Sequence, residues 1–131
     1  MWPREIAEAN EILPRLWIGT CASCDAARGK LFCVNVLENG HTDSGECLHF
    51  RILGDDGRAK IDRVRGAGRL IDWNWTNANG LLVHCGAGVE RSPLVVAMWM
   101  CQRFAMTLDE AYGWIRQRRP QAEDRRSWLI E

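Results

Sequence analysis

The sequence LLVHCGAGVERSPLVVAMWMCQRF occupies residues 81–104 and holds a short strand, a tight loop and a helix in direct succession. Residues 81–84 are an apolar run behind an Asn-Gly turn pair, which is typical of a buried strand. Residues 91–104 are apolar on nearly all sides, which predicts a buried helix. Residues 85–90 therefore form a loop that connects the carboxyl end of a strand to the start of a helix.

The remaining chain continues this alternation of strands and helices. Apolar residues recur every three or four positions over residues 61–71, which predicts a helix that covers one face of a sheet. Thr107 and Glu110 have the spacing of a capping box, and they predict a helix that stops before Pro120. Strands that alternate with helices predict an α/β fold with a mainly parallel sheet, whose ligand lies at the carboxyl ends of the strands. The other predicted strands are 16–18, 31–36 and 47–53.

Length, charge balance and the lengths of the apolar runs exclude several classes of protein. A length of 131 residues predicts one domain, residues 1–131. The 17 Lys and Arg residues balance 17 Asp and Glu residues, which argues against a mainly electrostatic nucleic-acid binder. No secretory signal is apparent, and the longest strongly apolar run, residues 94–101, is far shorter than the ~20 residues of a membrane helix. We therefore expect a cytoplasmic monomer with reduced thiols and no membrane or nucleic-acid partner.

The loop has the residue types that bind a phosphate group. Cys85 and Arg91 are separated by five residues, of which Gly86 and Gly88 allow close approach of the backbone. A loop this short can point successive N–H groups at one tetrahedral anion, and the following helix adds its positive end. Arg91 offers a planar fork to two phosphate oxygens, and the same charges favour a thiolate at Cys85 that can attack phosphorus. The predicted phosphate-binding residues are Gly86, Ala87, Gly88, Val89, Glu90 and Arg91.

Two neighbours of the loop have supporting roles in this interpretation. Ser92 directly follows the arginine, so its hydroxyl can donate to the Cys85 sulfur and help it leave when a phosphocysteine is hydrolysed. His84 is interpreted as a structural group that hydrogen-bonds the loop, because a thiolate needs no general base.

The pattern His-Cys-x-x-Gly-x-x-Arg-Ser over residues 84–92 resembles the signature of the cysteine-dependent protein tyrosine phosphatases. The pairs Ala87-Gly88 and Ser92-Pro93 are most similar to the dual-specificity branch. The resemblance implies a phosphocysteine mechanism without metal or cofactor, on a four- or five-stranded sheet flanked by helices. Further stretches that resemble this branch are residues 12–19, 33–36 and 111–120.

Such a mechanism needs a carboxylic acid that protonates the leaving oxygen and then acts as a base toward water. The resemblance places this acid on a loop after the third strand. Asp55 lies there, 30 residues before Cys85, and directly follows the predicted strand run, so it is the favoured acid. Asp56 is the alternative.

The predicted substrate is a phosphorylated protein or peptide. A small domain with few loops implies a shallow pocket, which admits phosphoserine and phosphothreonine as well as phosphotyrosine. The loop contains no lysine, and Glu90 would repel a polyanion, which disfavours phosphoinositides and RNA 5′-phosphates. These two substrates remain alternatives, as does a non-catalytic phosphate-binding module.

Other conspicuous residues have plainer interpretations. Cys21 and Cys24 have C-x-x-C spacing, but no second such pair and no histidine pair stands near them, so we expect no zinc site. Tryptophans at helical spacing are expected to pack, and a mixed charge cluster is expected to be a solvated face, with a phosphate-rich partner as its alternative. The cysteines expected in the core are Cys33, Cys47 and Cys101; the tryptophans are Trp99 and Trp114; the basic cluster comprises Arg116, Arg118, Arg119, Arg125 and Arg126.

Overall fold

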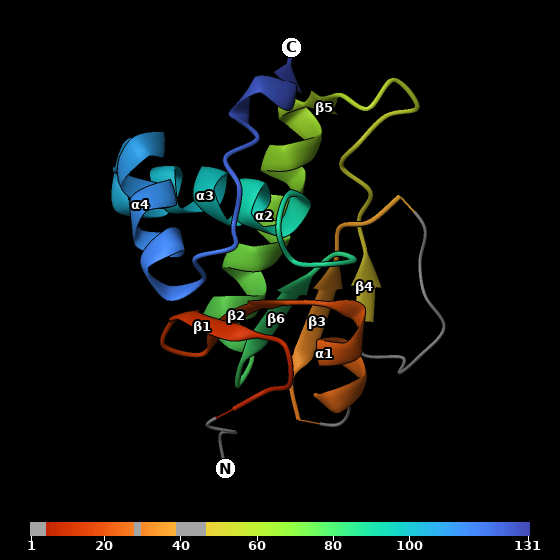
Figure 1. Cartoon of the computed structure of the whole chain (residues 1–131), viewed down its shortest axis with the longest axis vertical. Helices are drawn as coiled ribbons and strands as arrows, with labels where there is room; N and C mark the ends of the chain where they lie inside the picture. Colours follow the sequence, from red (N-terminus) through yellow and green to blue (C-terminus); the bar gives the residue numbers. More distant parts are fainter. Residues whose placement is uncertain (1–4, 28–29, 39–46) are drawn as a thin grey trace.

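A five-stranded sheet lies at the centre of the computed structural model, which describes residues 5–27, 30–38 and 47–131 (Figure 1). Its strands are β1 (Asn10–Leu13), β2 (Leu16–Gly19), β3 (Phe32–Asn35), β4 (Cys47–His49) and β6 (Leu81–His84). Their order is β1-β2-β6-β3-β4, and only the β1–β2 pair is antiparallel. The predicted α/β fold with a mainly parallel sheet is confirmed.

Helices cover both faces of this sheet, and Figure 1 shows α1 apart from the other three. Alternation along the strands separates two apolar clusters. On β6, Leu81 and Val83 belong to the larger cluster, which includes residues of α2, α3 and α4. Leu82 belongs to the smaller cluster, which includes Cys24 of α1. The helices are α1 (Cys21–Ala26), α2 (Ile61–Asn77), α3 (Arg91–Phe104) and α4 (Leu108–Arg118).

The predicted helices form where the sequence signals lie. The helix α3 has the predicted bounds, and α2 includes the predicted stripe and continues to Asn77. The capping box of α4 makes both of its hydrogen bonds: the Glu110 N–H donates to Thr107 Oγ1 over 3.1 Å, and the Thr107 N–H donates to Glu110 Oε1 over 2.9 Å. The helix α4 ends at Arg118, before Pro120.

The third predicted strand is shorter than expected. It ends at His49, and Leu53 instead forms an isolated antiparallel bridge with Ala59 around a turn over residues 54–57. As the last strand of the sheet, β4 pairs on one side only, so fewer hydrogen bonds extend it. The sequence analysis also missed short elements without a clear period: β1, α1, and the parallel pair β5 (Ala59–Lys60) and β7 (Leu129–Ile130).

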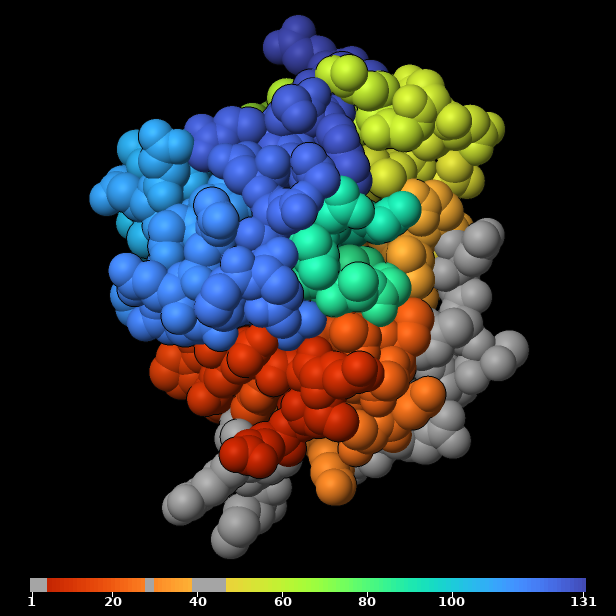
Figure 2. Space-filling view, viewed as in Figure 1, coloured from red at the N-terminus to blue at the C-terminus, as the bar shows by residue number. Residues whose placement is uncertain are grey.

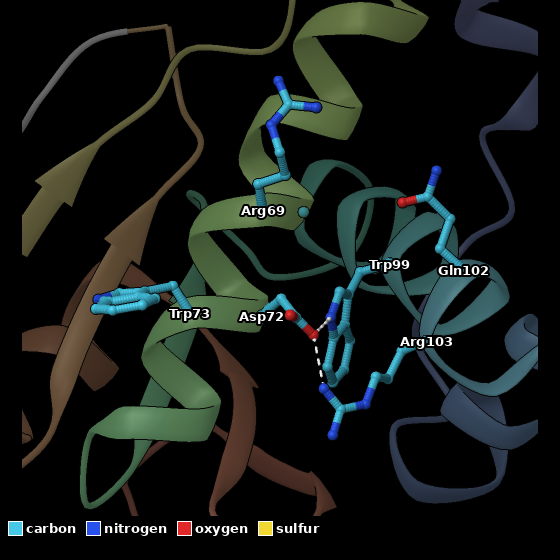
Figure 3. A pocket seen from close by; sticks show the side chains of 7 residues that line it. Arg69, Asp72, Trp73, Trp99, Gln102 and Arg103 are labelled. Atoms are coloured by element: carbon cyan, nitrogen blue, oxygen red, sulfur yellow. Dashed lines mark hydrogen bonds and ion pairs between the residues drawn. The ribbon is translucent and has the colours of Figure 1, made fainter.

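A cavity of about 410 Å³ lies between α2 and α3 (Figure 3). Asp72 accepts hydrogen bonds there from Trp99 Nε1 over 3.0 Å and from Arg103 Nη1 over 3.1 Å, and so links the two helices. Trp99 is buried, as predicted. Trp114, which we expected to pack, is 37% exposed, although its indole N–H donates to the Ile12 carbonyl over 2.8 Å. Among the described residues, no helix is both long and apolar enough to cross a membrane.

The capping box provides a test of local stability. Replacing Thr107 by Ala removes the side-chain acceptor at the start of α4, so we expect Thr107→Ala to lower the free energy of unfolding by about 1 kcal/mol. Urea denaturation followed by circular dichroism measures this change. Thr76→Ala is the control, since Thr76 is exposed within α2, and its effect should stay within about 0.5 kcal/mol. Equal losses in the two variants would contradict the capping role.

Candidate active site

The loop of residues 85–90 lies at the carboxyl end of β6, as predicted, and leads directly into α3 (Figure 1). The strand β6 lies between β2 and β3, so the start of the loop is anchored on both sides. Figure 2 shows this teal segment reaching the surface between the blue C-terminal part of the chain and the orange N-terminal part.

Cys85 lies at the base of the loop and is only 1% exposed. Ser92 is also buried, but its hydroxyl has no hydrogen-bond partner among the residues that the structure describes, so the expected bond to the Cys85 sulfur is not observed. The His84 ring lies on the other face of the sheet, with Nε2 3.5 Å from Cys47 Sγ. This contact links β6 to β4.

Three consecutive carbonyl groups of the loop are held from one side. The Arg119 guanidinium donates from Nη2 to the Ala87 oxygen over 3.1 Å and from Nε to the Gly88 oxygen over 2.8 Å. The Glu123 N–H donates to the Val89 oxygen over 2.8 Å. The segment that follows α4 thus fixes the orientation of three successive peptide groups.

This orientation determines where the amide groups of the loop point. In a trans peptide the C=O and the next N–H point in opposite directions, and no described peptide bond is cis. The N–H groups of Gly88, Val89 and Glu90 therefore point away from the segment that holds the carbonyls. Within the described part of the chain none of these three N–H groups donates to an acceptor. They form an array of donors suited to an anion.

Gly88 is the glycine that this arrangement requires. Its φ is +66°, and a Cβ there would lie 2.5 Å from the Gly19 oxygen and 2.7 Å from Arg119 Nη2. We expected the same role for Gly86, but its φ is not in the left-handed region, and a Cβ there would meet only Leu37 at 4.0 Å. The close approach of loop and arginine thus depends on Gly88 alone.

Arg119 is not part of a solvated face, and that prediction was wrong. It is 2% exposed, and its Nη1 also donates to Asn10 Oδ1 over 2.7 Å and to the Glu8 oxygen over 3.2 Å. Burial lowers the pKa of Arg119, while the charges of Cys85 and Glu8 oppose that shift. The one feature of the sequence that sets Arg119 apart from the other arginines of the cluster is its position directly before Pro120, where the helix must end.

The other arginines of the predicted cluster differ from Arg119. Arg125 pairs with Glu90 over 2.8 Å, and Arg126 pairs with Asp109 and Asp124, each over 2.7 Å. The negative charge of Glu90, which we expected to repel polyanions, is therefore matched by Arg125. Arg118 lies over the Trp114 ring.

Arg91 contacts a carboxylate that the sequence analysis did not identify. Its Nε and Nη2 donate to Glu38 Oε1 over 3.0 and 2.9 Å. Burial alone would raise the pKa of Glu38, but the hydrogen bond and the charge of Arg91 outweigh it and lower that pKa. The contact therefore persists at neutral pH and weakens only as the pH falls through the lowered value. Glu38 takes one N–H from Nε and one from Nη2 of Arg91. Both N–H groups of Nη1 and the second N–H of Nη2 are left to donate, which is enough for a bidentate bond to phosphate.

The two candidate acids occupy different places. Asp55 and Arg91 both line a cavity of about 600 Å³, where the exposed Asp55 carboxylate accepts from Arg51 Nη2 over 2.7 Å. Asp56 does not line this cavity; its Oδ1 accepts from the Arg58 N–H over 2.9 Å within the turn. Of the two candidate acids, Asp55 is thus the one that shares a cavity with Arg91.

The steric role of Gly88 can be tested with two Gly→Ala substitutions. We expect Gly88→Ala to weaken tungstate or phosphate binding at least tenfold, because the new Cβ collides with Gly19 and Arg119 and forces the loop to shift. Isothermal titration calorimetry measures this affinity. Gly113→Ala is the matched control: a Cβ there meets nothing within 4 Å, so binding should be unchanged and α4 stabilised by about 0.5–1 kcal/mol. Unchanged affinity in Gly88→Ala would contradict the loop geometry.

Comparison with known proteins agrees with this site. The family model for the catalytic domain of dual specificity phosphatases matches residues 31–130. Human dual specificity protein phosphatase 2 is 26% identical over 117 residues, which cover 83% of this chain and 37% of that protein. Human dual specificity protein phosphatase 5 is 31% identical over 117 residues, which cover 83% of this chain and 30% of that protein. The chain thus spans about a third of the length of these curated relatives.

Solved structures share the fold. The crystal structure of human DUSP28 is similar with a TM-score of 0.75 at 20% identity, covering 98% of this chain and 91% of that chain. The human tyrosine phosphatase-like serine/threonine/tyrosine-interacting protein has a TM-score of 0.72 at 18% identity, with 92% and 88% covered. With the family model matched over most of its length, this chain belongs to the dual specificity phosphatase catalytic-domain family, a family of cysteine-dependent phosphatases.

Proposed function

We propose that this domain hydrolyses phosphotyrosine, and also phosphoserine and phosphothreonine, in protein or peptide substrates through a phosphocysteine intermediate. The observation that carries the proposal is the loop itself. Its carbonyls at Ala87, Gly88 and Val89 are bonded to Arg119 and Glu123, which turns the N–H groups of residues 88–90 the other way, between the buried Cys85 and Arg91 in the sequence. An array of this kind binds a phosphoryl group and stabilises the charge that develops on it.

The reaction proceeds in two displacements. The Cys85 thiolate attacks phosphorus, a sulfur–phosphorus bond forms, and the ester oxygen leaves with a proton from Asp55. The Asp55 carboxylate then takes a proton from water, whose oxygen attacks the phosphocysteine and releases inorganic phosphate and the thiolate. Arg91 and the loop N–H groups hold the three non-bridging oxygens in both steps. Arg119, buried behind the loop, is a positioning residue in this scheme.

The charges around the cavity support a monophosphate substrate. Acidic residues at its wall are Glu38, Asp55 and Glu90, and the basic residues are Arg51 and Arg91. This wall offers no surplus of positive charge for the additional phosphates of an inositide or of a 5′-triphosphate. The pairing of Glu90 with Arg125 removes one repulsive charge without supplying a free cation.

One structure with this fold belongs to a protein described as phosphatase-like and as an interacting protein. The fold alone therefore does not establish catalysis, and turnover has to be measured. A non-catalytic phosphate-binding module would bind phosphate through the same loop but release no product.

Hydrolysis of p-nitrophenyl phosphate tests the proposal. We expect turnover that is unchanged when EDTA is added at the start of the assay and that is lost in Cys85→Ser, because serine is a far weaker nucleophile. Cys101→Ser is the matched control, since Cys101 lies on α3 outside the loop and the cavity, and it should retain wild-type rates. Tungstate binding without any turnover in the wild type would establish the binding module instead, and turnover that needs an added divalent metal would refute the thiolate mechanism.

The two aspartates can be separated by their leaving-group dependence. A general acid matters most when the leaving oxygen is a poor leaving group, and it typically contributes about 10²–10⁴ in rate. We expect Asp55→Asn to lose about this factor on a phosphotyrosine peptide, more on a phosphoserine peptide, and less on p-nitrophenyl phosphate. Steady-state kinetics with the three substrates measures these factors.

Asp56→Asn is the control for this experiment, because Asp56 accepts a hydrogen bond within the turn and does not line the cavity. Its losses should be small and should not depend on the leaving group. The assignment is falsified if Asp56→Asn shows the large, leaving-group-dependent loss while Asp55→Asn stays close to the wild type.

A further inference from the structure

The sheet face under α1 brings together donor atoms that bind soft metals. The sulfurs of Cys24 and Cys47 and a ring nitrogen of His84 all lie within 4.8 Å of one another. Cys24 and His84 are buried, and Cys47 is half-buried. These residues come from α1, β4 and β6, so only the folded chain places them together.

The strand register adds a fourth donor. Cys33 on β3 is the Cα partner of Cys47 on β4, and aligned residues of neighbouring strands present their side chains on the same face. Cys33 is buried in the same apolar cluster as Cys24, with Cys47 packed against it. Three thiols and one imidazole thus lie on this face of the sheet, and Cys33 is the one whose sulfur lies outside the close group.

We propose that Cys24, Cys47 and His84 bind one structural Zn²⁺ ion, and that Cys33, whose sulfur lies outside this close group, completes the tetrahedral set when the ion binds. Tetrahedral zinc with Zn–S of about 2.3 Å and Zn–N of about 2.0 Å separates a sulfur from a nitrogen ligand by about 3.6 Å. The distance from Cys47 Sγ to His84 Nε2 is 3.5 Å. The set of three cysteines and one histidine is a common set for structural zinc. On binding, the thiols lose their protons to solvent and the thiolates are neutralised largely by the ion.

Of the two cysteines in the C-x-x-C pair, only Cys24 belongs to this site. Cys21 lies apart from the three close donors, with its Sγ 3.7 Å from the Cys85 carbonyl oxygen. We expected no zinc site because no second C-x-x-C pair and no histidine pair stands near Cys21 and Cys24 in the sequence; the fold instead brings His84 and Cys47 to Cys24. That residue directly precedes Cys85, so the ion would anchor the strand end from which the phosphate loop starts, on the face opposite α3, without taking part in the hydrolysis proposed above.

The test is the metal content of untagged protein purified from zinc-supplemented cells. We expect about one zinc ion per chain by inductively coupled plasma mass spectrometry, and a tetrahedral cobalt–thiolate absorption spectrum after refolding with Co²⁺. Cys24→Ser and Cys47→Ser should each weaken Zn²⁺ binding, measured against a chromophoric chelator, by more than the ~10–100-fold typical of second-shell changes. Removing the metal should also lower the melting temperature of the wild type.

Two matched Cys→Ser controls locate the metal. Cys101 lies on α3, away from the cluster, so the Cys101→Ser variant should bind Zn²⁺ like the wild type. The Cys85→Ser variant lacks the proposed nucleophile, so it should lose phosphatase activity but still bind Zn²⁺ like the wild type. Loss of metal in Cys85→Ser with retention in Cys47→Ser would overturn the proposal, as would a wild type that holds no stoichiometric zinc and shows no cobalt–thiolate spectrum. The wild-type measurements decide the question even if a ligand variant does not fold.

Discussion

The hydrogen bonds of one buried guanidinium determine the shape of the phosphate loop. Arg119 donates to the carbonyls of Ala87, Gly88 and Glu8 and to the Asn10 side chain. A buried charge without these acceptors would cost several kcal/mol, so the fold is stable only when loop, N-terminal segment and the end of α4 come together. Because each peptide group is planar, turning the carbonyls toward Arg119 turns the next N–H groups away from it. The anion site therefore follows from a structural requirement.

The strand β6 separates two kinds of chemistry by the alternation of its side chains. Val83 packs under the large helical layer, whereas His84 faces Cys24 of α1 and Cys47 of β4. The next residue, Cys85, begins the loop. His84 contacts Cys47 just before the loop begins, while Arg119 and Glu123 hold the carbonyl groups in the middle of the loop. The proposed zinc ion would strengthen the first of these restraints and leave the second unchanged.

Features encoded by contiguous residues could be predicted from the sequence, and features made by distant residues could not. The strand β6, the loop and α3 follow from one uninterrupted pattern, and the capping box of α4 from two residues three positions apart. Asp55 was predicted as the general acid, with Asp56 as its alternative, from its spacing to Cys85 and the resemblance to a family, and that role stays a prediction. The contacts of Glu38 with Arg91 and of His84 with Cys47, however, join residues that are 53 and 37 positions apart, and only the sheet register brings them together.

The balance of charge indicates how a chain with no net charge can still bind an anion. Most surface arginines of the C-terminal part are matched by nearby carboxylates, as Arg125 is by Glu90 and Arg126 by Asp124, so they add little long-range attraction. The groups that favour an anion lie close together in and after the loop: N–H groups that have no acceptor among the described residues, the start of α3, and Arg91. A short-range field of this kind suits the single phosphoryl group of the proposed substrate. It has little reach toward a second phosphate, so under the proposed function selection among phosphoproteins would depend on contacts with the peptide around the phosphorylated residue.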